Sequence, residues 1–294
     1  MNATIARYTT SSVTSKDGTT IGYRQLGDGP GLVLLHGAME SAGSHIGLAE
    51  LVSDTFTVYL PDRRGRGMSG PYPKHYNVRN DIEDMDALLI RTGAHFVFGV
   101  SSGAIIALGA ALTLPAVRKA AIFEPPLMID GTTPSALVRR YDDEIAQGKV
   151  AAALVTGMKA ARLGPPIFDL IPRGVLERLT QQMLVRDDQR AKPGDVTVRM
   201  LAPTLHYDFA LVTQSHGALE SFKAIRADVL LLGGGKSPAF LRAGLDALER
   251  VLPSAERIEF PGLAHSASGN PDDPMTGRGA DPGRVAVELR RFFA

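Results

Sequence analysis

Short apolar runs alternate along the chain with longer segments of helical periodicity. The apolar runs are Leu32–Leu35, Phe56–Leu60, Phe96–Val100, Ala120–Phe123 and Val229–Leu232. Runs that are apolar throughout are typical of strands covered on both faces in a parallel sheet. Two further strands are expected: Thr20–Arg24, which alternates and suits an antiparallel edge, and Arg257–Phe260 near the end.

Amphipathic helices are predicted between these runs. Asn80–Arg91 places Ile82, Met85 and Leu89 on one face. Two dipeptides, Ser237-Pro238 and Asp281-Pro282, pair a capping side chain with proline at the first helical position, which marks a helix start. Strand–helix alternation of this kind predicts a doubly wound α/β sheet.

The alternation stops between about Leu127 and Gly217 and resumes near Ala224. Helix-like stretches dominate the interval, namely Pro134–Gln147, Lys149–Leu163 and Gly174–Val185. We interpret this interval as a helical insertion within one α/β domain.

The composition excludes several classes of protein. The 294 residues have a formal net charge of +1, so no overall field favours nucleic acid or acidic lipid. Cysteine is absent, which excludes disulfides, thiolate metal sites and a cysteine nucleophile. No apolar segment approaches the ~20 residues that cross a bilayer, and the N-terminus lacks the apolar run of a signal peptide. We expect a cytoplasmic protein with a small-molecule substrate, no nucleic-acid or membrane partner, and no metal or organic cofactor; a homo-oligomer is left open.

Segment 99–103, Gly-Val-Ser-Ser-Gly, lies between a predicted strand and a predicted helix. This is the Gly-x-Ser-x-Gly elbow in the context that it requires, because the strained turn exposes the central serine and crowds the residues two positions away. Ser101 is the expected nucleophile. Its neighbour Ser102 is expected to donate its backbone N–H to the oxyanion. The alternative is a glycine-rich turn with no chemical role.

An oxyanion hole needs a second donor, which usually comes from the loop after an earlier strand. The loop that begins at His36 and Gly37 follows such a strand, and we expect the backbone N–H of Ala38 to be that donor. His36 itself is interpreted as a packed residue that shapes the loop. The charged, glycine-rich segment 62–70 lacks the Gly-Lys-Ser/Thr ending of a phosphate loop, so Asp62 and Arg64 are expected to hold backbone near the site.

His265 is the expected general base. It alone among the seven histidines lies in a loop after the last predicted strand, downstream of Ser101, and histidine has a pKa near neutrality. His206 lies in the insertion and is either a pocket or a structural residue. The others are interpreted as surface or packing residues: His45, His75, His95 and His216.

Together these motifs resemble the α/β-hydrolase superfamily over essentially the whole chain. The resemblance implies a mostly parallel eight-stranded sheet flanked by helices. It also implies a core of residues 1–127 and 218–294, with a helical cap of residues 128–217 inserted after the sixth strand. Members cleave esters, lactones, thioesters and carbon–carbon bonds, and a few are hormone receptors.

One departure from the superfamily concerns the acid of the catalytic triad. The usual acid follows the seventh strand, where segment 233–238 of this chain contains no Asp or Glu. Glu124, at the end of the sixth strand, is the expected substitute, as in zearalenone-type lactonases and some haloalkane dehalogenases. Two alternatives are that Glu124 is a salt-bridged residue supporting the cap, or that Asp130 is the acid.

The expected activity is hydrolysis of an ester or lactone of a small, largely apolar molecule through an acyl-enzyme. Carbon–carbon bond hydrolysis by the same residues is an alternative, and a ligand-binding protein with little turnover is another. The expected pocket residues are Met39, Leu127, Met128, Met158 and His206.

Overall fold

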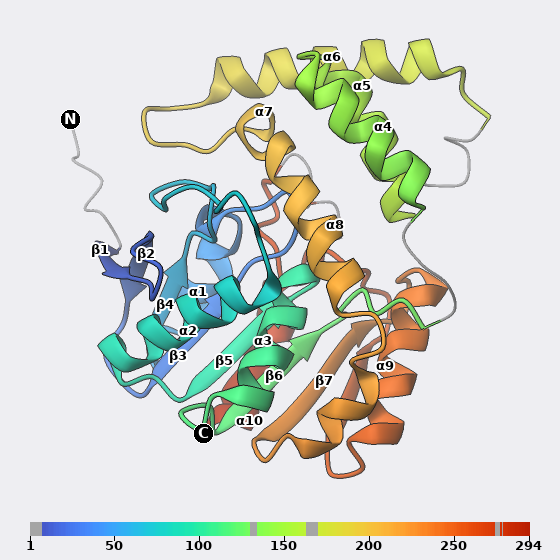
Figure 1. Cartoon of the computed structure of the whole chain (residues 1–294). Helices are drawn as coiled ribbons and strands as arrows, with labels where there is room; N and C mark the ends of the chain where they lie inside the picture. The colour runs from blue at the N-terminus through green and yellow to red at the C-terminus, as the bar shows by residue number, and fades with distance from the viewer. Residues whose placement is uncertain (1–7, 130–133, 163–169, 274–276, 278) are drawn as a thin grey trace.

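The computed structural model describes residues 8–129, 134–162, 170–273, 277 and 279–294. Its centre is one eight-stranded sheet with the order β1-β2-β4-β3-β5-β6-β7-β8 (Figure 1). The strands are β1 (Thr9–Thr14), β2 (Thr20–Leu26), β3 (Gly31–Leu35), β4 (Thr57–Pro61), β5 (Phe96–Val100), β6 (Lys119–Phe123), β7 (Asp228–Gly234) and β8 (Glu256–Phe260). Pairing is parallel from β4 to β8 and antiparallel at β1 and β2. The predicted fold class, a mostly parallel sheet flanked by helices, is confirmed.

The prediction that Thr20–Arg24 forms the antiparallel edge is wrong in one respect. That segment is β2, which pairs with both β1 and β4, so β1 is the edge strand. Only Val13 is buried in β1, whose sequence is otherwise Thr and Ser. An exposed polar strand carries no hydrophobic pattern, which is why no strand was predicted there.

Helices cover both faces of the sheet (Figure 1). One core cluster joins α2 (Val78–Thr92), α3 (Ser102–Thr113) and α9 (Ala239–Val251) to one face. A second cluster joins α1 (Ile46–Val52) and α10 (Pro282–Phe293) to the other. Two covered faces explain the strands that are apolar throughout.

Within the described residues, five α-helices follow one another between β6 and β7. They are α4 (Ser135–Ala146), α5 (Val150–Ala161), α6 (Arg173–Arg190), α7 (Val198–Leu201) and α8 (Leu205–Gln214). Figure 1 shows α4, α5 and α6 above the carboxyl ends of the parallel strands, while α8 descends onto the core. We call these five helices the cap helices. The expected helix 174–185 is longer than predicted, and no helix was predicted for α7 or α8.

Candidate active site

Ser101 occupies the sharp turn between β5 and α3. Its φ of 53° lies in the left-handed region, which is strained for a residue with a side chain. The neighbouring glycines relieve crowding: a Cβ on Gly99 would stand 2.5 Å from the Gly103 carbonyl oxygen, and a Cβ on Gly103 would stand 2.5 Å from that of His36. These distances match the reason for which the elbow requires glycine on both sides of the serine.

Two backbone amides are available beside Ser101. The amide of Ser102 lies in the first turn of α3, where helix geometry provides no acceptor. Among the described residues, none accepts a hydrogen bond from the Ala38 amide. Ala38, Ser101 and Ser102 line one cavity, so both amides are near the serine.

His265 lies against Glu124 in the same region. Its Nδ1 is 2.7 Å from Oε2 of Glu124, and the carboxylate is fully buried. The other carboxylate oxygen, Oε1, accepts a hydrogen bond of 2.7 Å from the amide of Gly234. Because Nδ1 is taken by Glu124, Nε2 is the ring nitrogen left for proton exchange. The carboxyl end of β7 therefore contributes a backbone amide that holds the Glu124 carboxylate.

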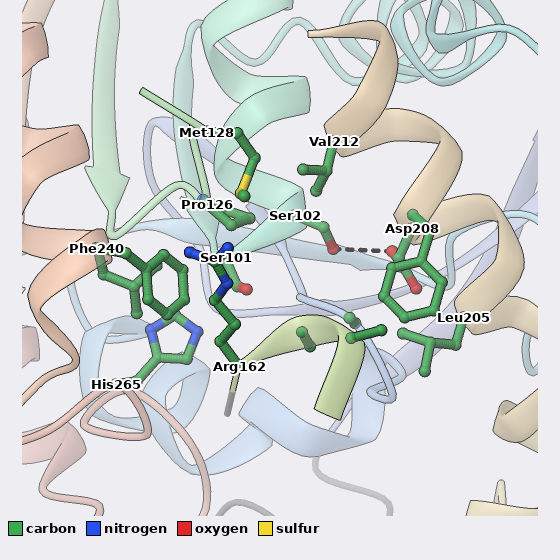
Figure 2. A pocket seen from close by; sticks show the side chains of 15 residues that line it. Ser101, Ser102, Pro126, Met128, Arg162, Leu205, Asp208, Val212, Phe240 and His265 are labelled. Carbon is green, nitrogen blue, oxygen red and sulfur yellow. Dashed lines mark hydrogen bonds between the residues drawn. The ribbon is translucent and has the colours of Figure 1, made fainter. Parts of the chain in front are cut away.

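The cavity that contains Ser101 and His265 has mostly apolar walls. Its lining residues are Ala38, Ser101, Ser102, Pro126, Met128, Ala160, Ala161, Arg162, Leu205, Asp208, Phe209, Val212, Phe240, Leu241 and His265 (Figure 2). These residues come from the core and from the cap helices α5 and α8. The site can therefore enclose an apolar substrate against the serine.

Of the five pocket residues predicted from the sequence, only Met128 lines this cavity. Leu127 is buried in the core instead, and Met39 packs against the cap helices beside Ala38. Met158 is half-buried on α5. His206 is exposed, with its Nδ1 2.9 Å from Oδ1 of Asp142, so the neighbours on its helix face the cavity in its place. Asp130 lies outside the described residues.

Comparisons with known proteins show the family and support the fold. The sequence model described as the alpha/beta hydrolase family matches residues 32–276. The chain belongs to the α/β hydrolase family. A solved α/β hydrolase from Sphaerobacter thermophilus is 33% identical and has a TM-score of 0.76, covering 97% of this chain and 100% of that one.

Two further relatives of this α/β hydrolase have named activities. A 2-(acetamidomethylene)succinate hydrolase from Mesorhizobium japonicum is 26% identical over 84% of this chain and 85% of its own length. The esterase RhEst1 from a Rhodococcus species is 20% identical with a TM-score of 0.64, covering 96% of this chain and 98% of that one, a likeness of fold alone.

One wall of the cavity of this hydrolase contains a buried cluster of charges that was not predicted from the sequence. Asp208 on α8 accepts hydrogen bonds of 2.9 Å from Arg63 and 2.8 Å from Ser102 through Oδ1, and one of 2.5 Å from Arg66 through Oδ2. Burial disfavours the charged form of Asp208, but Arg66 and Arg63 outweigh it and lower the pKa of the carboxyl. The cluster therefore joins a cap helix to the loop after β4 through ionised groups. An acid inside a predicted helical insertion has no sequence signal that separates it from surface acids.

Asp62 holds backbone near the site as expected, whereas the same expectation is wrong for Arg64, which contacts side chains away from the site. Asp62 accepts hydrogen bonds from the amides of Ala42 (2.9 Å) and Met68 (3.1 Å). Arg64 binds Asp84 through two hydrogen bonds of 2.6 Å, on the side of α2. Asp62 therefore pins loops near the site, whereas Arg64 ties α2 to the segment.

Two buried histidines hold the loop that contains Ala38. His36 accepts from the Arg63 amide through Nε2 (3.1 Å), and burial together with Arg66 and Arg63 lowers its pKa well below the ordinary value, so the ring is neutral. His45 is buried against Glu40, with 3.0 Å between Nε2 and Oε2. Glu40 also accepts a hydrogen bond of 2.6 Å from the Gly37 amide. These contacts fix the backbone next to Ala38.

The described residues contain no group of three or more His, Cys, Asp or Glu side chains that could hold a metal ion. Among the same residues, no helix is long and apolar enough to cross a membrane.

Proposed function

We propose that this chain is a serine hydrolase that cleaves an ester or lactone of a small, largely apolar molecule through an acyl-enzyme. The observation that carries the proposal is the 2.7 Å contact between His265 Nδ1 and the buried Glu124, at the cavity that also contains Ser101. A carboxylate on Nδ1 fixes the tautomer that leaves Nε2 as the base and stabilises the imidazolium that forms.

The proposed reaction has two halves. Ser101 Oγ attacks the carbonyl carbon while His265 Nε2 takes its proton, and the amides of Ala38 and Ser102 hold the oxyanion. Collapse of the intermediate breaks the carbon–oxygen bond, and His265 returns the proton to the leaving alcohol. Water then attacks the acyl-enzyme by the same steps and releases the acid and Ser101.

We also propose that residues 128–217 act as a cap that selects the substrate, over a core of residues 1–127 and 218–294. Two cap helices, α5 and α8, supply six of the fifteen residues that line the cavity. They contribute no group to the proposed triad, so the cap is assigned to binding and the core to chemistry.

The test is hydrolysis of p-nitrophenyl acetate and butyrate, combined with labelling by a fluorophosphonate. We expect turnover of both esters and a mass increase on the peptide that contains Ser101, each absent in Ser101→Ala. A folded protein that neither hydrolyses these esters nor takes up the label contradicts the proposal. Cleavage of a vinylogous 1,5-diketone in preference to both esters would instead support carbon–carbon bond hydrolysis by the same residues.

A further inference from the structure

Arg162 is a charged residue of the cavity that takes no part in the proposed reaction. Arg162 follows the last residue of α5 with a φ of 55°, in the left-handed region where glycine is the usual residue. Four described residues other than glycine have a positive φ: Met39, Ser101, Glu124 and Arg162. The first three belong to the oxyanion loop, the nucleophile turn and the proposed acid. Backbone strain of this kind collects at functional sites, so Arg162 shares a property of the catalytic residues.

The guanidinium of Arg162 is uncompensated. No described residue forms a hydrogen bond or ion pair with it, although the side chain lines the cavity. Figure 2 shows it reaching toward Ser101 from the cap side. The residue is exposed, which places the charge at the cavity mouth. An arginine here is available to a ligand that enters the cavity.

The other cavity charges are already balanced. Both oxygens of Asp208 accept hydrogen bonds, from Arg63 and Arg66 among others. Arg63 also lies 3.8 Å from Asp81, measured from Nε to Oδ1. The buried cluster thus pairs two guanidinium groups with two carboxyl groups. Asp208 offers no free oxygen to Arg162, and the cavity has a surplus of one positive charge at its mouth.

We propose that Arg162 binds a carboxylate of the substrate, so that the natural substrate is a small, otherwise apolar ester or lactone that also carries a free carboxylate. A carboxylate matches the planar fork of guanidinium with two parallel hydrogen bonds. One guanidinium balances the single charge of a carboxylate, whereas a phosphate dianion would keep one charge unpaired. The apolar walls then hold the carbon chain between the carboxylate and the scissile carbonyl.

This inference rests on the proposed function for the position of the scissile bond. It makes Arg162 a binding residue rather than a member of the triad. Because the contact is made remote from the carbonyl, it is present in the ground state and in the transition state alike. Removal of the contact between Arg162 and the carboxylate is therefore expected to raise KM and to leave kcat unchanged.

Two matched pairs of esters test the inference. Monoethyl glutarate and ethyl valerate differ by a carboxylate on the acyl side, and 4-acetoxybutyrate and butyl acetate differ by one on the alcohol side. In Arg162→Met we expect KM to rise about 10- to 100-fold for the charged member of at least one pair, with both neutral esters changed less than about threefold. In Arg162→Lys, the KM of the charged ester should lie between those of the wild type and Arg162→Met, because lysine keeps the charge but cannot form the two parallel hydrogen bonds of guanidinium. Arg178→Met, which removes an exposed cation of α6 outside the cavity, is the control for the general field and should change neither pair.

A binding measurement separates failure of this inference from failure of the proposed function. Calorimetry measures the binding of monoethyl glutarate to Ser101→Ala without turnover. In the double variant with Arg162→Met, Kd should rise about 10- to 100-fold. The role of Arg162 would be overturned if Arg162→Met left the Kd of monoethyl glutarate and the KM of both charged esters unchanged, in a protein that still hydrolyses p-nitrophenyl acetate. Inorganic phosphate competing better than glutarate would overturn the choice of carboxylate. Loss of p-nitrophenyl acetate hydrolysis and of the Ser101 label counts against the proposed function alone.

Discussion

At the scale of single residues, the site depends on side chains held in strained backbone positions. Ser101 and Glu124 have φ values of 53° and 45°, each costing about 1–3 kcal/mol. Contacts on both sides hold them: the Ser101 amide donates to Phe123, and Glu124 accepts from Gly234. The strain is thus maintained by strands β6 and β7, which direct Ser101 to the cavity and Glu124 to His265.

The two adjacent serines are expected to respond differently to loss of their hydroxyl groups. Ser101→Ala removes the attacking oxygen, and we expect kcat/KM for p-nitrophenyl acetate to fall at least ~10³-fold. Ser102→Ala keeps the oxyanion amide and loses a hydroxyl that bonds Asp208, so a loss below about tenfold is expected. Steady-state kinetics of the two folded variants check this. A larger loss in Ser102→Ala than in Ser101→Ala would exchange their roles.

Glu124→Gln is expected to lower kcat about 10²- to 10⁴-fold, because an amide no longer stabilises the imidazolium of His265. Glu124→Asp shortens the side chain that spans to His265 and should retain more activity than the glutamine variant. The thermal midpoint of each variant shows whether the fold survives. Full activity of a folded Glu124→Gln protein would rule Glu124 out as the acid.

The buried Glu40–His45 pair predicts a pH-dependent stability. Burial opposes both charges, but their mutual attraction raises the pKa of His45 and lowers that of Glu40. His45 also lies between two acceptors, the carbonyl of Ser268 and Glu40, which requires a proton on each ring nitrogen. The contribution of His45 is complete below its unfolded pKa and is lost as pH rises through the raised folded value. That of Glu40 is complete above its unfolded pKa and is lost as pH falls through the lowered one.

The wild type should therefore exceed Glu40→Gln in unfolding free energy by about 1–3 kcal/mol between pH ~4.5 and ~6.5, with the difference shrinking on either side. Urea unfolding across this range measures it. Glu220→Gln, which removes half of an exposed pair with Lys223, serves as the control and should show little change. A difference independent of pH would mean that the pair is not ionised.

At the scale of elements, the sequence predicts the buried strands, which share one apolar pattern, and misses elements that lack such a pattern. The apolar runs located five strands because each of these strands is covered on both faces of the sheet. β1 and α8 were missed: β1 is polar and exposed, and nothing in the sequence distinguishes α8 from its neighbours before the chain is folded. The catalytic candidates were chosen from motif and strand-end positions, and the structure brings them together, with His265 against Glu124 and at one cavity with Ser101. The predicted cavity walls were mostly wrong. Only Met128 of the predicted pocket residues lines the cavity, since lining depends on how the cap helices pack.

Met128 and Met158 offer a matched test of the cavity walls. Met128→Ala enlarges the cavity and should raise kcat/KM for p-nitrophenyl hexanoate relative to the acetate by about three- to tenfold, because each added methylene of the ester gains burial. Met158→Ala, on α5 and outside the lining, should leave that ratio unchanged. The measurement is kcat/KM for p-nitrophenyl esters of increasing acyl length in both variants. An equal change of the ratio in Met158→Ala and Met128→Ala would mean that the acyl chain does not bind along the Met128 wall.

At the scale of the whole molecule, the cap helices and the core meet through the Asp208 cluster. Arg63 and Arg66 project from the loop after β4, and Asp208 reaches them from α8, more than a hundred residues later in the chain. Removing one partner of a buried ionic cluster leaves the others charged and unpaired, which costs more than the cluster itself contributes. The cluster therefore holds the cap in position over Ser101 and also makes the stability of cap and core interdependent.

Asp208→Asn is expected to lower the free energy of unfolding by about 3–5 kcal/mol, because buried Arg66 loses its counter-charge and Arg63 keeps only Asp81, at 3.8 Å. Urea unfolding followed by fluorescence and by circular dichroism measures the loss. Asp142→Asn, at the exposed pair with His206, is the control from the same cap and should change stability by less than about 1 kcal/mol. The double variant Asp208→Asn with Arg66→Met removes one stranded cation and should recover part of the loss. Two results would show that the cluster does not couple the cap to the core. One is an Asp208→Asn protein as stable as Asp142→Asn; the other is a double variant whose loss of stability equals the sum of the losses of Asp208→Asn and Arg66→Met.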